Sequence, residues 1–234
     1  MFAVGDVHGY CSELELILRW MEHDQMLGSD DLVIFIGDYI DRGKDSRGVV
    51  DRLIDFKSRF PDTVFLRGNH EDMLLGFLGM GGSHGDVFIT NGGKATLRSY
   101  GLDEWATPSQ LLSAMPQSHI DFFSSLELAV RCGGYLFVHA GINPRFSLFE
   151  QVADDLLWIR EEFFSCRHSL NLTVVFGHTP FADVFFELPY RVGIDTGIAY
   201  GNKLSCVELT QGIVASVPKE GKAVITTQND HSTF

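Results

Sequence analysis

The sequence predicts an α/β fold in which two mixed β-sheets are stacked and covered by helices, giving four layers. Three observations support this. The first 70 residues alternate short apolar runs with amphipathic helices, most residues from 128 onward form short strand-like runs, and Gly-flanked polar turns follow many of the runs. Strands that alternate with helices form parallel βαβ units, and ligands gather beyond the carboxyl ends of such strands. We therefore expect a functional site at that edge.

In the amino-terminal half, strands are expected at residues 2–4, 32–36 and 63–66. A helix should begin at Ser12, whose hydroxyl forms a capping box with Glu15 three residues later. Leu14, Ile17 and Leu18 then recur at helical spacing. A second helix should begin near Ser46, which we expect to be its capping residue. These elements alternate in the order required for a parallel sheet.

Residues 72–127 interrupt this pattern and are predicted to be a helical insertion beside the site. Within it, Thr107 is a capping residue followed by Pro108 at the first helical position. After the insertion, residues 128–132 and 135–139 flank a Gly-Gly turn and predict a hairpin. Further strands are expected at 173–176, 191–194, 204–209 and 213–217. We expect one domain over residues 1–220 and a frayed polar tail over 221–234.

Composition excludes several classes of protein. The 234 residues include 18 basic and 31 acidic side chains, and the net charge of −13 argues against binding to nucleic acid. No apolar run approaches the roughly 20 residues that span a bilayer, and we expect no signal peptide because a strand is expected at residues 2–4. The four cysteines show no metal-binding or disulfide spacing. A reduced, cytoplasmic protein is expected, with a redox role for Cys11 as the alternative.

Five short motifs carry most of the chemical information, and four of them follow directly on an apolar run. They are Gly5-Asp6-Val7-His8-Gly9, Gly37-Asp38-Tyr39-Ile40-Asp41-Arg42-Gly43, Gly68-Asn69-His70-Glu71, His139-Ala140-Gly141 and Gly177-His178-Thr179. Each alone is compatible with an ordinary turn, but their joint occurrence at strand ends is not. Oxygen and imidazole donors without a thiolate suit two divalent cations, with Asp38 central enough to bridge them. Two cations about 3.5–4 Å apart are a recurrent device for hydrolysing phosphate esters.

These residue types fit that reaction. A phosphate ester repels an anionic nucleophile, so the site needs the positive charge that cations and arginines supply. An alkoxide is a poor leaving group and needs an acid whose pKa lies near ambient pH, which favours histidine. No cysteine lies in a phosphate-binding loop. The sequence therefore favours direct attack by a metal-activated hydroxide over a covalent thiol mechanism.

The motifs resemble those of the phosphoprotein phosphatase superfamily of binuclear metallophosphoesterases, whose pattern is GDxHG, GDxxDRG, GNHE, HAG and GH. The chain carries every member of this pattern between Gly5 and His178. Its length, together with residues 157–161 and 194–197, is similar to the bacterial and phage lambda protein phosphatase-like branch. The resemblance implies the αββα metallophosphoesterase sandwich and hydrolysis by a metal-bridging hydroxide.

The resemblance also implies roles for individual residues. It assigns Asp6 and His8 to one metal, Asp38 to both, and Asn69, His139 and His178 to the other. His70 would protonate the leaving oxygen while Asp41 accepts its other N–H, and Arg42 and Arg160 would bind the phosphate oxygens. Mn²⁺ is the expected activator, with Fe or Zn as alternatives. Tyr200 is one position displaced from a tyrosine of the eukaryotic enzymes and receives no role. Asp195 and Asn91 are left between a site role and an ordinary turn or loop.

The expected substrate is a phosphorylated protein or small phosphoester, with phosphoserine and phosphothreonine first. The alternative is a symmetrical dinucleoside tetraphosphate hydrolase, a sister branch with the same metal core. Its motifs are usually closer to GNHD and GHW, where this chain has Glu71 and Thr179. A non-catalytic binding module is a third hypothesis, and the complete set of donors argues against it. His23, His84, His119, His168 and His231 match no motif and are expected to be surface or hydrogen-bonded histidines.

Overall fold

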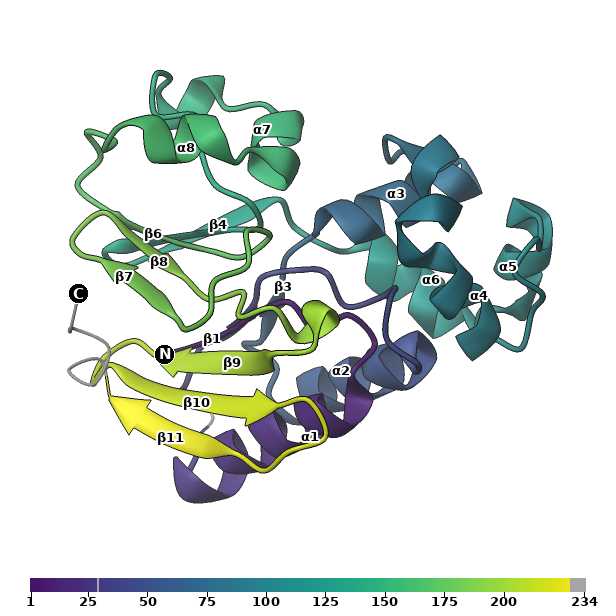
Figure 1. Cartoon of the computed structure of the whole chain (residues 1–234), viewed down its shortest axis with the longest axis horizontal. Helices are drawn as coiled ribbons and strands as arrows, with labels where there is room; N and C mark the ends of the chain where they lie inside the picture. The colour runs from purple at the N-terminus through teal and green to yellow at the C-terminus, as the bar shows by residue number, and fades with distance from the viewer. Residues whose placement is uncertain (29, 228–234) are drawn as a thin grey trace.

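The computed structural model describes residues 1–28 and 30–227 and contains two stacked mixed sheets (Figure 1). One sheet has six strands in the order β11-β10-β9-β1-β2-β3, and the other has five in the order β4-β5-β6-β8-β7. β1, β2 and β3 are parallel, as are β5, β6 and β8. The strands are β1 (Phe2–Val4), β2 (Val33–Phe35), β3 (Val64–Phe65), β4 (Ala129–Cys132), β5 (Tyr135–Val138), β6 (Thr173–Phe176), β7 (Phe185–Glu187), β8 (Arg191–Gly193), β9 (Lys203–Glu208), β10 (Ile213–Pro218) and β11 (Val224–Thr227).

Helices cover the outer face of each sheet, which confirms the predicted four-layer sandwich. In Figure 1, α1 and α2 lie against the six-stranded sheet, and α7 and α8 lie over the five-stranded one. The α-helices are α1 (Cys11–Arg19), α2 (Ser46–Arg59), α3 (Asn69–Leu78), α4 (Lys94–Ser99), α5 (Pro108–Ala114), α6 (Gln117–Ser124), α7 (Ala153–Trp158) and α8 (Glu161–Ser165). None of the helices in the described residues is long and apolar enough to cross a membrane.

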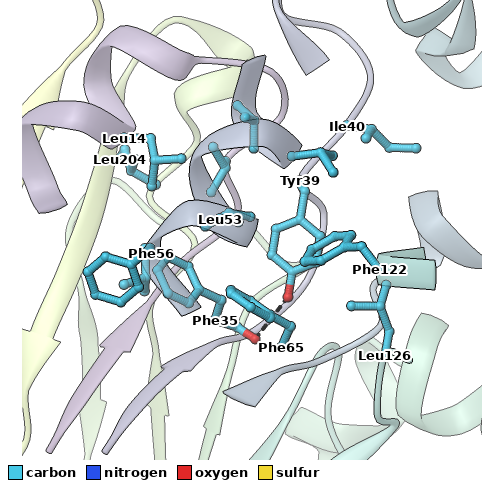
Figure 2. Packing of buried hydrophobic residues seen from close by; sticks show 14 of the residues in the cluster. Leu14, Phe35, Tyr39, Ile40, Leu53, Phe56, Phe65, Phe122, Leu126 and Leu204 are labelled. Carbon is cyan, nitrogen blue, oxygen red and sulfur yellow. Dashed lines mark hydrogen bonds between the residues drawn. The ribbon is translucent and has the colours of Figure 1, made fainter. Parts of the chain in front are cut away.

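Three apolar clusters fill the spaces between the layers, and the strands feed them by alternation. Phe35 on β2 packs toward α1 and α2, whereas the preceding Ile34 packs between the sheets. On β6, Val175 packs between the sheets and Phe176 packs toward α7 and α8. This period of two is what a strand buried on both faces requires. In the first cluster the buried Tyr39 hydroxyl lies 2.7 Å from the Leu66 carbonyl oxygen and 3.1 Å from that of Phe35, and Figure 2 marks the second contact.

Two of the predicted helix caps are wrong. α1 begins at Cys11 and its cap position is Tyr10, so Ser12 lies inside the first turn. α2 begins at Ser46, and its cap is Asp45, whose carboxylate accepts from the Gly48 N–H at 2.8 Å. The Ser46 hydroxyl is thereby free to bond elsewhere, as described below. At α5, the expected cap at Thr107 and its capping box are confirmed.

Residues 72–127 contain helices and loops in the structure and form the right-hand part of Figure 1. The hairpin after this segment is confirmed, since β4 and β5 pair antiparallel. Two strands were not predicted. β7 pairs with β8, and β11 pairs with β10 inside the stretch that we expected to be a tail. Residues 228–234, with His231, lie outside the described residues.

Candidate metal centre

The five motifs lie at the carboxyl ends of parallel strands β1, β2, β3, β5 and β6. Five side-chain-bearing residues there adopt left-handed backbone angles: His8, Asp38, Asp41, Arg42 and His178, with φ between 48° and 71°. Such angles are uncommon outside glycine and cluster at functional sites. The strand-to-helix turns are therefore bent sharply enough to aim several polar side chains at one point.

Glycines let these turns approach each other. A Cβ on Gly68 would lie 2.2 Å from Asp38 Oδ1, and a Cβ on Gly37 would lie 2.5 Å from the Gly68 amide nitrogen. Both distances are far inside van der Waals contact, so any side chain would force the turns apart. The GD and GN pairs of the motifs thus have a packing reason as well as a chemical one.

Asp38 lies at the centre of the site, with its two carboxylate oxygens facing two different histidines. Oδ2 is 3.4 Å from His8 Nε2, and Oδ1 is 3.4 Å from His139 Nε2. All three side chains are buried. A carboxylate placed in this way could be shared between two cations, which is the role expected for Asp38.

On the Oδ1 side of Asp38, the site brings together Asn69, His139 and His178. Asn69 Oδ1 is 2.9 Å from His139 Nε2 and 3.0 Å from His178 Nδ1. Two donors bound to one ion at about 2.1 Å lie about 3.0–3.4 Å apart, so these separations suit a shared cation. The donor atoms of Asp38, His139 and His178 all lie within 4.8 Å of one another.

On the other side of Asp38, His8 and Asp6 line a cavity of about 160 Å³, which Asp38, Asn69 and His178 also line. Both Asp6 oxygens lie near the backbone N–H of His178, at 3.1 and 3.4 Å. The structure therefore brings together all six residues predicted as metal ligands. They offer only nitrogen and oxygen atoms, a donor set that fits two hard or borderline divalent cations.

Backbone carbonyls fix the orientation of two of the histidines. His8 Nδ1 is 2.9 Å from the Ile40 oxygen, and His139 Nδ1 is 2.8 Å from the Ile36 oxygen. A carbonyl can only accept, so Nδ1 carries the hydrogen and Nε2 keeps its lone pair for a ligand. At His178, Nε2 is buried and has no hydrogen-bond partner among the described residues, and Nδ1 faces the other donors.

Electrostatics also prepare the site for cations. Burial lowers the pKa of His8 to about 3 and of His178 to about 2, so both rings are neutral at ordinary pH. Burial alone would raise the pKa of Asp38, but the surrounding histidines, His139 first, hold it below its usual range. Burial and the charges of Asp195 and Asp38 raise the pKa of Asp6. A cation would relieve this crowding of buried carboxylates.

His70 lies beside this cluster and is paired with Asp41. Its Nδ1 is 2.7 Å from Asp41 Oδ2, and its Nε2 is 3.9 Å from Asp38 Oδ2. Burial would lower the pKa of His70, but Asp38 and the hydrogen-bonded Asp41 raise it above its usual value. A protonated ring held by Asp41 can present an Nε2–H toward the cavity, as the predicted acid requires.

Arg42 and Arg160 both line the cavity. Arg42 Nη1 is 3.5 Å from His8 Nε2 and donates to the Tyr200 hydroxyl at 3.0 Å. Arg160 Nη1 donates to Thr179 Oγ1 at 3.4 Å. Neither guanidinium has a carboxylate partner among the described ion pairs, so both remain available for an anion.

Sequence reasoning missed the role of Glu71. This fully buried carboxylate accepts four backbone N–H bonds, from Asp38, Tyr39, Ile40 and Gly68, at 2.8–3.3 Å. It therefore holds the second and third motifs together. The only local signal was a glutamate in the first turn of a helix, which fits many helices equally well.

Three further residues lie at the cavity. Tyr200, which received no role, reaches the cavity and contacts Arg42, and Asn91 also lines it. Asp195 lines the cavity too, but its Oδ1 accepts from the Gly197 N–H at 2.9 Å, which supports the turn interpretation. Burial raises the pKa of Asp195 to about 6.

Cys11 is one of four free cysteines, and burial raises its thiol pKa to about 11, which disfavours the redox alternative.

Two stacked mixed sheets, with aspartates, an asparagine and histidines gathered at the strand ends, define a metallophosphoesterase. The chain belongs to the calcineurin-like phosphoesterase family, whose model matches residues 2–203. This family uses a binuclear divalent metal centre to hydrolyse phosphate esters.

Individual relatives differ in their named substrates. The chain is 29% identical to serine/threonine-protein phosphatase 1 of Salmonella typhimurium, over 89% of this chain and 91% of the relative. It is 24% identical to an asymmetrical bis(5'-nucleosyl)-tetraphosphatase of Anoxybacillus flavithermus, over 92% of both chains. A crystal structure of a candidate diadenosine tetraphosphatase superposes with a TM-score of 0.65 at 23% identity, covering 97% of this chain and 92% of that one. The last similarity concerns the fold alone.

Proposed function

We propose that this protein is a metal-dependent phosphomonoesterase that acts on phosphoserine and phosphothreonine in proteins. The observation that carries the proposal is the pair formed by His70 and Asp41, whose side chains lie 2.7 Å apart beside the Asp38-centred cluster. Such a pair supplies a proton to a leaving oxygen.

The value of an acid depends on the leaving group. Serine and threonine leave as alkoxides, which are strongly basic and need protonation as the P–O bond breaks. A nucleotide leaves as a phosphate anion, which is a much weaker base and gains less from an acid. A buried His70 whose pKa is raised by Asp38 and Asp41 is therefore better matched to an alkyl phosphate than to a polyphosphate.

Other residues of the chain would bind and orient the phosphate. Arg42 and Arg160 border the cavity from opposite halves of the sequence, and a guanidinium can hold two phosphate oxygens at once. When bound by Asp6, His8, Asp38, Asn69, His139 and His178, two divalent cations would supply positive charge and an activated water. Mn²⁺ is the proposed activator because of the family resemblance, and nitrogen and oxygen donors without a thiolate would also accept Fe or Zn.

Dinucleoside tetraphosphate hydrolysis is the second candidate, because curated relatives at 24–25% identity carry that name. Those relatives are named as asymmetrical enzymes, which would release ATP and AMP, whereas a symmetrical enzyme would release ADP. The relative with the higher identity is named as a protein phosphatase, which favours the first candidate.

A paired initial-rate assay with Mn²⁺ tests the proposal, using a phosphothreonine peptide and diadenosine tetraphosphate at equal concentrations. We expect faster release of phosphate from the peptide. Faster formation of ADP, or of ATP and AMP, would reject the proposal in favour of the second candidate and would show which bond is cleaved.

A further inference from the structure

The buried carboxylate of Asp41 has two hydrogen-bonding partners, one on each oxygen. Oδ2 lies 2.7 Å from His70 Nδ1, and Oδ1 lies 2.5 Å from Thr96 Oγ1. Asp41 and Thr96 are both fully buried, so water does not compete for these bonds. The partner of His70 is thus itself held from the far side by a threonine.

The direction of the hydrogens around Thr96 follows from counting donors. Its Oγ1 lies 3.0 Å from the Asp41 backbone nitrogen and 3.0 Å from the Ser46 hydroxyl. A hydroxyl has one hydrogen, and an ionised carboxylate has none to give. The Thr96 hydrogen therefore points at Asp41, and Thr96 accepts from Ser46 and shares the Asp41 N–H with the Ser46 oxygen, which is also 3.0 Å from that nitrogen.

Thr96 belongs to α4, within the helical segment 72–127 that the five motifs do not include. The same segment contacts the neighbouring residue of the second motif, where the Arg42 N–H donates to the Gly92 carbonyl at 3.4 Å. A Cβ on Gly92 would lie 2.9 Å from Arg42 Cγ. Two adjacent site residues, Asp41 and Arg42, are therefore buttressed by one short stretch of the insertion.

We propose that Thr96 is a positioning residue for the leaving-group acid, which rests on the proposed phosphomonoesterase function. The terminal torsion of an aspartate is broad and intrinsically permits rotation of the carboxylate. With Oδ1 held by Thr96, the carboxylate plane is fixed, and with it the ring of His70. The orientation of His70 then sets where its Nε2–H points.

The step that depends on this orientation is a proton transfer. As water attacks phosphorus and the P–O bond to the alcohol breaks, the electron pair of the broken bond stays on the leaving oxygen, which takes the proton from His70 Nε2 and departs as an alcohol. The Nδ1–H stays bonded to Asp41, and the ring becomes neutral. A ring turned away from the leaving oxygen would lose this transfer without disturbing the residues that bind the phosphate.

The test replaces Thr96 by Val, which keeps the shape and removes the hydroxyl, and by Ser, which keeps the hydroxyl. Thr63→Val is the matched control, because Thr63 is also buried and donates only to the Phe60 carbonyl, at 2.7 Å, outside the site. Each Mn²⁺-loaded variant is assayed with an alkyl phosphate, which needs the acid, and with p-nitrophenyl phosphate, whose leaving group does not. Bound Mn²⁺ and the unfolding midpoint are measured for each.

We expect Thr96→Val to lose roughly 10–100-fold in kcat on the alkyl phosphate, a part of the ~10²–10⁴ that a general acid contributes. On the aryl phosphate it should lose less than about threefold, Thr96→Ser should recover most of the alkyl rate, and Thr63→Val should change neither. Equal losses on both substrates, or no loss, would overturn the proposal. Thr96→Ala provides the same comparison if Thr96→Val does not fold.

His70→Asn separates this proposal from the function beneath it. If His70→Asn loses the alkyl rate selectively and Thr96→Val does not, only the role of Thr96 is rejected. If His70→Asn shows no selective loss, the acid itself is wrongly assigned and the phosphomonoesterase proposal loses its main support.

Discussion

Replacing Glu71 by Gln tests how the second and third motifs are held together. Glu71 Oε1 accepts from the Tyr39 and Ile40 N–H groups, and Oε2 accepts from those of Asp38 and Gly68. A glutamine keeps the shape but places an NH₂ group against two of these four donors. A buried donor left without an acceptor costs about 1–3 kcal/mol, so two cost about 2–6 kcal/mol. Total stabilities of about 5–15 kcal/mol make this a large fraction.

Unfolding by urea is measured on the metal-free protein at pH 9, above the pKa of about 8 to which burial raises Glu71, so that its carboxylate is ionised. Glu13→Gln is the matched control. Glu13 is also buried, but it accepts one backbone N–H, from Glu220 at 2.8 Å, which a glutamine oxygen can still accept. We expect Glu71→Gln to lose about 2–6 kcal/mol and the control less than about 1 kcal/mol.

A second readout is Mn²⁺ affinity, because Glu71 accepts the backbone N–H of Asp38 and so helps to fix the position of that proposed ligand. Replacing a residue that holds a metal ligand by a hydrogen bond typically weakens metal binding about 10–100-fold. A Glu71→Gln variant with the stability and the Mn²⁺ affinity of the Glu13→Gln control would refute the reasoning, since the two motifs would then be held by other contacts.

Two further predictions concern cation binding. Mn²⁺ affinity should rise between about pH 5 and 7, because burial raises the pKa of Asp195 to about 6 and also raises that of Asp6, and a cation favours the ionised forms. His8, whose pKa is about 3, should add no dependence in that range. Calorimetric titration of Asp195→Asn, which can still accept from the Gly197 N–H, should show a flatter dependence; an unchanged slope would assign the protons to other groups. Removing the cations with a chelator should abolish turnover. It should also lower the free energy of unfolding by about 2.7 kcal/mol for each site at which the free Mn²⁺ concentration had been 100 times the Kd. A chelated protein that unfolds at the same denaturant concentration as the Mn²⁺-loaded protein would contradict the proposed centre.

The metal-ligand candidates were readable from the sequence because each motif is local. A strand end, a glycine and a polar residue occupy a few consecutive positions, and parallel strands bring such ends to one edge. Asp38 and His139 each follow a buried strand, but β2 and β5 belong to different sheets, so their meeting at 3.4 Å depends on how the two sheets stack, which the sequence implied only through the family resemblance. Period-two burial on the strands likewise comes from local alternation.

The errors in the sequence prediction arose where several local choices had similar energies. Ser12 and Ser46 are good capping residues, but Tyr10 and Asp45 occupy the cap positions. Ser46 instead bonds to Asp41 and Thr96, a use that depends on where α4 packs. β11 forms within the expected tail because Val224–Thr227 are strand-favouring residues, a signal that the prediction overlooked, and because β10 offers them an edge to pair with.

By itself, the sequence determined which atoms can bind cations and which edge of the sheets presents them, because those features follow from chain-local patterns. The tertiary structure alone decided what supports them. Glu71 reaches Asp38 across 33 positions, Thr96 reaches Asp41 across 55, and Tyr200 reaches Arg42 across 158. Such contacts carry no periodic signal along the chain. They depend on the register of strands and the packing of helices, which only the folded molecule fixes.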